Sequence, residues 1–293
     1  MDVFSVPPGE LRDMAGSPDA VARFLTQAAA CAPSVYGTAP WWFSAADGDV
    51  CLRADHERGL AVADPAGREL TISCGAAVFV ARVALRYLGL VPQVSILPEP
   101  EVPDLIASIG WASGRLEPSA AERALFERLP AARATDGRFA SPRLPAGLMA
   151  GLAEAAAEEG AALRIMADAD HEAALLAVTD AATFALRLDQ ARLAEASEPR
   201  GDGHGWRLPP ADLVITPESA GVVTVLTTAA DQRADWVAAG QALQRLLLSS
   251  ASAGAGLAIS SQALEFAPLR EFVAAQFAAG AAPQLLLRFG PSS

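Results

Sequence analysis

The sequence contains no lysine, and all 22 of its basic residues are arginine. Charged residues make up only 19% of its 293 residues, and the formal net charge is -12. A chain this acidic lacks the basic patches with which proteins bind nucleic-acid backbones or anionic membrane surfaces. We therefore expect neither a nucleic acid nor a membrane among its partners.

Cysteine is scarce as well. The three cysteines, Cys31, Cys51 and Cys74, are odd in number and form no C-x-x-C pair. All three occur in apolar stretches, which is typical of buried, reduced thiols. The first residues also have no basic start followed by an apolar run, which a secretory signal would need. These features predict a cytoplasmic protein.

The common catalytic and metal-binding motifs are absent from the sequence. It has no G-x-S-x-G elbow, no Walker loop and no H-E-x-x-H. Its three histidines, His56, His171 and His204, lie far apart and lack metal-ligand spacing. We expect no metal site and identify no catalytic side chain.

Hydrophobic residues are plentiful instead, at 52% of the chain, which is ample for a sizeable core. The longest apolar stretch, 74–90, is interrupted by Arg82 and Arg86. It therefore predicts a helix buried in the core rather than a membrane span.

The clearest positive signal is an internal repeat. Gly75 and Gly89 bracket one apolar helical stretch, and Gly240 and Gly254 bracket another with the same spacing of 14 residues. In this pattern Gly75 and Gly240 open the two apolar helical stretches. The repeat predicts a dimer fused into one polypeptide, with two units at 1–130 and 131–293.

A second pair of segments supports the repeat and adds a difference between the copies. Segment 103–110, Pro-Asp-Leu-Ile-Ala-Ser-Ile-Gly, resembles segment 283–290, Pro-Gln-Leu-Leu-Leu-Arg-Phe-Gly. The second copy has Arg288 where the first has Ser108. A single arginine indicates that only one of two related sites binds an anion.

The order of the hydrophobic patterns predicts an α+β fold rather than a doubly wound sheet. Helices are expected at 19–30, capped by Ser17 or Asp19, and at 73–88, 119–129, 145–159, 171–194, 234–250 and 268–277. Strands are expected from Trp42, and at 50–54, 94–97, 105–109, 163–166, 222–227 and 284–289. A hairpin turn is expected at 47–49, and a loop rich in glycine, proline and charge at 195–213.

Segment 32–43, Ala-Pro-Ser-Val-Tyr-Gly-Thr-Ala-Pro-Trp-Trp-Phe, predicts an ordered loop between a helix and a strand. Such a loop can present backbone N–H groups to a phosphate or to the edge of a flavin ring. A well-packed proline and tryptophan turn with no ligand would give the same pattern.

Arginines mark two further candidate positions. In segment 133–139, Arg133 and Arg138 flank Thr135, and two guanidiniums near a hydroxyl can bind a phosphate. A solvated linker is the alternative there. Arg288 lies in an apolar terminal strand, where a charge needs a partner, either an anionic ligand or an acidic side chain.

These segments together resemble one known family. Segment 32–41 is similar to the loop A-P-S-x-x-N-x-Q-P-W of the nitroreductase superfamily. Segments 64–77, 133–139, 239–245 and 283–290 narrow the resemblance to the Acg-type actinobacterial proteins, in which two nitroreductase units are fused in one chain. The resemblance covers roughly residues 20 to 290.

The resemblance implies a nitroreductase-like α+β fold and one FMN per chain, held between the halves. The residues it assigns to FMN are Pro33, Ser34, Val35 and Gly37 in the first half, and Arg133, Thr135, Arg138, Ser260, Ser261 and Arg288 in the second half. Of these, Arg133, Thr135, Arg138 and Arg288 would serve the phosphate, and Ser260 and Ser261 would lie near the isoalloxazine ring.

The function implied is that of an FMN-dependent oxidoreductase, in which NAD(P)H reduces the flavin and a nitroaromatic or quinone acceptor reoxidises it. The partners would be these small molecules, and the chain would be a monomer built as a pseudo-dimer, or a homodimer. An FMN-sequestering protein without turnover and a flavin-free pseudoenzyme are the alternatives.

The sequence departs from the family pattern at four positions. Gly37 and Ala39 replace the usual asparagine and glutamine, and Ala134 and Gly137 stand where basic residues are common. Each lost donor weakens flavin binding by roughly 1–3 kcal/mol if its partner stays buried. The 195–213 segment is also shorter than the segment that often covers the flavin in Acg-type proteins.

Overall fold

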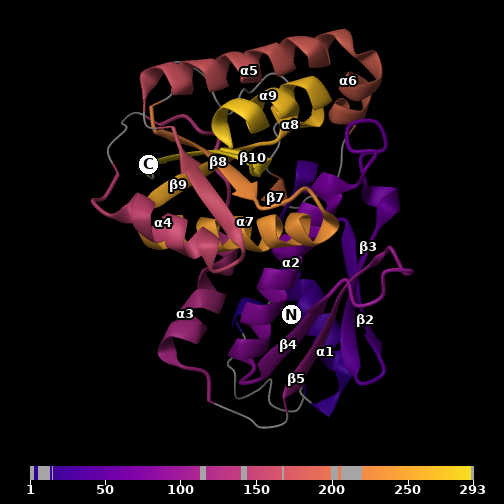
Figure 1. Cartoon of the computed structure of the whole chain (residues 1–293). Coiled ribbons are helices and arrows are strands. Elements are labelled where there is room, and N and C mark those ends of the chain that lie inside the picture. The colour runs from indigo at the N-terminus through magenta and orange to yellow at the C-terminus, as the bar shows by residue number, and fades with distance from the viewer. Residues whose placement is uncertain are drawn as a thin grey trace.

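The computed structural model describes residues 3–5, 14, 16–112, 117–139, 144–166, 168–198, 204–205 and 220–291. Two four-stranded antiparallel sheets lie on either side of two long helices that pack against each other, α2 and α7 (Figure 1). The fold is therefore mixed α+β, as the sequence predicts.

The first sheet has the order β2-β3-β5-β4. Its strands are β2 (Trp41–Ala46), β3 (Asp49–Ala54), β4 (Val91–Ile96) and β5 (Leu105–Ala112). The predicted hairpin turn joins β2 to β3, and its two central residues, Asp47 and Gly48, have φ of 51° and 91°. Positive φ at both positions is what a two-residue turn between antiparallel strands requires.

The second sheet has the order β6-β8-β10-β9. Its strands are β6 (Ala161–Ile165), β8 (Val222–Thr228), β9 (Ala255–Ser260) and β10 (Ala282–Pro291). In both sheets the central helix follows the second strand of the order, and the next strand in the chain lies at the far edge. The two sheets thus share one topology, which is consistent with two related units.

The two central helices meet at the glycines of the predicted repeat. Helices α2 (Arg68–Tyr87) and α7 (Arg233–Ser252) each have 20 residues. A Cβ added to Gly75 would lie 2.3 Å from the carbonyl oxygen of Val237, and one added to Gly240 would lie 1.9 Å from that of Ile72. Each glycine therefore faces the residue three positions before the other glycine, which is the reciprocal contact of a two-fold interface.

This geometry corrects one sequence prediction. The two glycines do not open the helices; each is the eighth residue of its helix, at the crossing point. A side chain there would hold the two backbones apart, so glycine is required for packing and not for ending a turn. Gly89 and Gly254 do follow the helix ends, with φ of 75° and 70°, as C-terminal glycines do.

Helix α2 is long and apolar enough to cross a membrane by length and composition alone, but 89% of its most apolar window is buried inside the molecule. The main hydrophobic cluster includes residues of α2, α7 and both sheets. The core therefore runs across the junction between the two units, and α2 is the central core helix that the sequence predicts.

The remaining helices cover the outer faces. They are α1 (Pro18–Ala29), α3 (Ala120–Arg128), α4 (Leu148–Ala157), α5 (Ala169–Leu188), α6 (Gln190–Ser197), α8 (Gln262–Glu265) and α9 (Ala267–Phe277), with 3-10 turns at Val3–Ser5, Val35–Gly37, His56–Arg58 and Leu129–Ala131. Helices α5, α8 and α9 cover the face of the second sheet opposite α7 (Figure 1). A short parallel pair, β1 (Pro33–Ser34) and β7 (His204–Gly205), links the two halves.

Several elements differ from the sequence predictions, and the short elements β1, β7 and α8 were not predicted. The long helix expected at 171–194 is two helices, because Asp189 leaves helical geometry and its side chain accepts a hydrogen bond from the N–H of Arg192 at 3.1 Å. The expected 195–213 loop accordingly begins inside α6, and most of it lies outside the described residues. Strand β9 was not predicted, because its small apolar residues show no alternation.

Candidate functional site

The first predicted loop is ordered and partly strained. Tyr36 and Ala39 have φ of 51° and 43°, and Gly37 has φ of 68°. Left-handed backbone at residues other than glycine is costly and concentrates at functional sites. The neighbouring Ser34 and Val35 are buried, and Pro33 and Ser34 form the short strand β1.

Two N–H groups of this loop already have side-chain partners within the protein. Val35 donates its N–H to the hydroxyl of Ser73 at 3.3 Å, and Ala39 donates to the hydroxyl of Ser34 at 2.9 Å. The loop is therefore held by its own serine and by one from α2. These two groups cannot bind a ligand without giving up an internal hydrogen bond.

The second predicted segment runs along the edge of β9. Thr135 donates its backbone N–H to the carbonyl of Leu257 at 2.8 Å. Its hydroxyl oxygen is buried and has no hydrogen-bond partner among the described residues. The two arginines of this segment point outward: Arg133 bonds the carbonyl of Pro130 at 3.0 Å, and Arg138 lies 3.7 Å from Asp136 with a side chain 71% exposed.

Arg288 is fully buried in the middle of β10. Among the described residues it forms an ion pair with Glu172, at the start of α5, with 3.9 Å between guanidinium nitrogen and carboxylate oxygen. Burial lowers the pKa of Arg288, and Glu172 acts against that shift. The acidic side chain that sequence reasoning offered as one alternative is thus present, although at a distance beyond a direct hydrogen bond.

Thr135 and Arg288 lie on the same face of the second sheet. Gly256 pairs with Gly290 and Ala258 pairs with Arg288, so these positions share a face. A Cβ added to Gly256 would lie 3.0 Å from the methyl group of Thr135.

Ser260, opposite Leu286, is on this face too, at the other end of β9. Ser260 is four positions after Gly256 along the strand, which is about 13 Å.

Helix α2 brings the first loop and the second-half residues together. Ser73, which binds Val35, donates its own hydroxyl to the carbonyl of Glu69 at 2.7 Å, and the hydroxyl of Ser261 bonds the carboxyl of Glu69. Burial raises the pKa of the Cys31 thiol to about 12, and the positive charge of Arg133 acts against that shift. Residues of both halves therefore meet beside the first turns of α2.

A buried acidic cluster at this place was missed by sequence reasoning. Glu69 is fully buried, and burial raises its pKa from 4.5 to about 7, while Arg68 at 3.3 Å acts against the shift. Burial and the nearby Glu69 raise the pKa of Glu265, whose partner Arg192 lies 3.4 Å away. Only the Arg-Glu pair at 68–69 is visible in the sequence; the other members come from distant elements.

No established family model matches the chain. Among curated proteins, "Putative NAD(P)H nitroreductase Rv3131" of Mycobacterium tuberculosis H37Rv is 30% identical over 298 residues, spanning 93% of this chain and 86% of the relative. The chain belongs to the nitroreductase family. "Putative NAD(P)H nitroreductase acg" of the same strain is 28% identical over 294 residues, spanning 92% and 88% of the two chains. "Uncharacterized protein Rv3127" is 26% identical, spanning 88% and 83%.

Membership of the nitroreductase family raises the question of whether these residues suit FMN. The phosphate end offers an arginine and a buried hydroxyl without a described partner on one sheet face, where the ring of Phe139 also packs against Gly256 and Gly290. A phosphate can accept from both groups. The loop end fits less closely, because the N–H groups of Val35 and Ala39 are occupied. This chain therefore has more of the features of a phosphate site than of a site for the isoalloxazine ring.

Proposed function

We propose that this protein binds one FMN between two nitroreductase-like units, 1–130 and 131–293, and acts as an NAD(P)H-dependent oxidoreductase. The reciprocal contact between Gly75 and Gly240 supports the fused-dimer arrangement. The single observation that carries cofactor binding is that Arg288 and the Thr135 hydroxyl, which has no partner among the described residues, lie on one sheet face.

The chain's own residues would bind and orient the cofactor. Arg288, Thr135 and Arg133 would hold the phosphate, and Arg138 is exposed enough to turn toward it. Ser260 and Ser261, together with the loop at 33–37, would lie beside the ring. The bound flavin would supply the electron transfer between a nicotinamide donor and an acceptor such as a nitroaromatic or a quinone.

A flavin-free protein is the second candidate, because one observation favours it. The N–H groups of Val35 and Ala39 are bound to serine hydroxyls, so these two donors of the loop are satisfied without a ligand. In that case the Arg288 charge would be balanced by the protein alone, with Glu172 as the described acidic neighbour.

The visible spectrum of the purified protein separates the two candidates. Flavin absorption bands support the FMN proposal, and their absence after reconstitution with FMN contradicts it. Anaerobic mixing of the yellow protein with NADPH or NADH then tests turnover. Rapid bleaching supports an oxidoreductase, whereas a spectrum that stays unchanged indicates a protein that stores FMN without turnover.

A further inference from the structure

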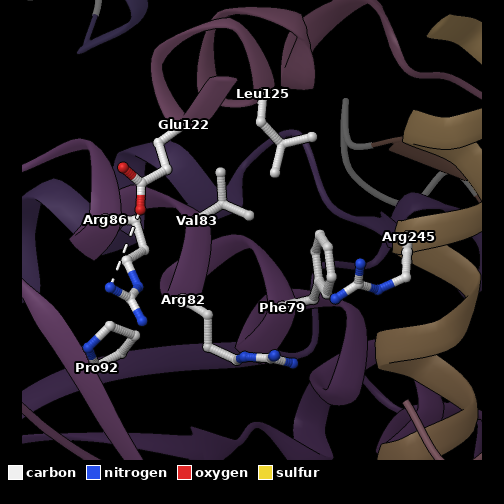
Figure 2. A pocket seen from close by; sticks show the side chains of 8 residues that line it. All are labelled: Phe79, Arg82, Val83, Arg86, Pro92, Glu122, Leu125 and Arg245. Carbon is white, nitrogen blue, oxygen red and sulfur yellow. Dashed lines mark ion pairs between the residues drawn. The ribbon is translucent and has the colours of Figure 1, made fainter. Parts of the chain in front are cut away.

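A cavity of about 230 Å³ lies at the junction of the two units, on the opposite part of α2 from the predicted flavin residues. Its lining comes from α2, α3 and β4 of the first unit and from α7 of the second. Figure 2 shows three arginines around it, Arg82, Arg86 and Arg245. Arg82 and Arg86 are the two charges that interrupt the longest apolar stretch, and the proposed flavin site uses neither.

Two of these arginines are held in place by the protein. Glu159, whose side chain is only 3% exposed, accepts from Arg82 at 2.6 Å and from Arg245 at 2.8 Å. Both guanidiniums also lie over the ring of Phe79, at 5.5 Å and 5.2 Å from its centre. The positions of these cations therefore need no ligand to be maintained, which lowers the cost of binding an anion there.

The third arginine, Arg86, can still donate hydrogen bonds to a ligand. Arg86 lies one turn after Arg82 on the same face of α2, and its closest acidic neighbour, Glu122, is 4.0 Å away. That distance is too long for a hydrogen bond. The Arg86 side chain is 43% exposed, so a ligand entering the cavity can reach it.

Apart from the three arginines and Glu122, the lining is apolar. Leu125 of α3 points toward Val83 of α2, and Pro92 lies beside Arg86 (Figure 2). A dry cavity of 150 Å³ is enough for benzene in another protein, so 230 Å³ is enough for one aromatic ring with a small substituent. The cavity therefore has an apolar surface against which an aromatic ring can pack, next to the guanidiniums of Arg82 and Arg86.

We propose that this cavity binds a small organic anion with one carboxylate on a single aromatic ring. The ring would pack between Val83 and Leu125, and the carboxylate would bind Arg82 and Arg86. The site is separate from the proposed flavin site and does not depend on FMN. A ligand here would contact both units, since α7 contributes Arg245.

Fluorine NMR of 4-fluorobenzoate with the purified full-length protein tests the site. We expect saturable binding, and binding of the neutral analogue 4-fluorobenzamide at least about tenfold weaker, because a charge-assisted hydrogen bond is lost. Equal binding of the two probes, or no saturable binding of 4-fluorobenzoate, would overturn the proposal.

Four variants locate the binding. Arg86→Gln should weaken 4-fluorobenzoate about tenfold or more, whereas Arg128→Gln, which removes an exposed charge from α3 outside the cavity, should not. Leu125→Trp should fill the cavity and abolish binding with all charges kept. Arg288→Met should leave binding unchanged, which separates this cavity from the flavin site.

Melting temperatures show whether each variant is folded. Equal affinities of Arg86→Gln and Arg128→Gln, full binding by Leu125→Trp, or loss of binding in folded Arg288→Met would each contradict the assignment.

Discussion

Arg288 is the residue on which the proposed cofactor site depends most. It is fully buried on the sheet face that carries the Thr135 hydroxyl. Arg288→Met keeps the length of the side chain and removes its charge. We expect FMN retention to fall by about tenfold or more, because a charge-assisted contact to phosphate is lost.

The matched control is Arg164→Met, on the exposed side of β6 in the same sheet. Flavin fluorescence after gel filtration measures the FMN that each variant retains. Equal retention by the two folded variants would show that Arg288 does not face the phosphate.

Glu69 is the residue for which the structure predicts a pH effect. Burial raises its pKa from 4.5 to about 7, and its charged neighbours are Arg68, Asp64, Arg192 and Glu265. The folded state therefore binds a proton more tightly than the unfolded state. The contribution of this proton to the free energy of unfolding is complete below about pH 4.5 and is lost as the pH rises to about 7.

Glu69→Gln removes this ionisation and keeps an oxygen that Arg68 and Ser261 can still bind. The melting temperature of the variant minus that of the wild type should rise between about pH 4.5 and pH 7 and then level off. Thermal melts over pH 4.5 to 8.5 measure this difference, and parallel curves would show that Glu69 is not the group that titrates.

At the scale of the elements, the contact between α2 and α7 makes the sharpest prediction. Gly240→Ala would put a methyl group 1.9 Å from the carbonyl oxygen of Ile72, so the helices must separate. We expect a loss of roughly 1–3 kcal/mol or more in the free energy of unfolding. Urea denaturation measures it.

Gly151→Ala in α4 is the matched control, because no atom of the residues that the structure describes lies within 4 Å of the added Cβ. That change should raise stability by roughly 0.5–1 kcal/mol, since alanine favours a helix over glycine. If both changes had the same effect, the close crossing of the helices would be wrong.

Local signals explain why many element boundaries could be predicted. Ser17 accepts from the N–H of Ala20 at 3.3 Å, and Ser119 caps α3 reciprocally with Glu122. Such caps and the Asp47-Gly48 turn depend on residues close in sequence. The break at Asp189 also has a local cause, but the continuous apolar pattern on both sides hid it.

The candidate site was only partly predictable, because its geometry depends on contacts between distant segments. The motifs indicated Thr135 and Arg288, which the fold places on one sheet face. They gave no sign that Ser73 would occupy the N–H of Val35, or that Glu69 and Glu265 would be buried together. The cavity at the junction of the two units was missed for the same reason, since its arginines lie on α2 and α7.

At the scale of the whole molecule, the two halves share a topology and differ in their charges. The position equivalent to Arg288 is Ser108, which bonds Asp49 at 3.0 Å in the first sheet. An anion site built on Arg288 therefore has no counterpart with an arginine at that position in the other half. The molecule as a whole should bind one FMN rather than the two expected of a symmetric dimer.

The stoichiometry of the released cofactor tests this account most directly. The purified protein, reconstituted with FMN and freed of excess, is denatured, and the released molecule is identified by mass and counted against protein. The account predicts FMN at one molecule per chain. Release of no flavin, or of two molecules per chain, would contradict it.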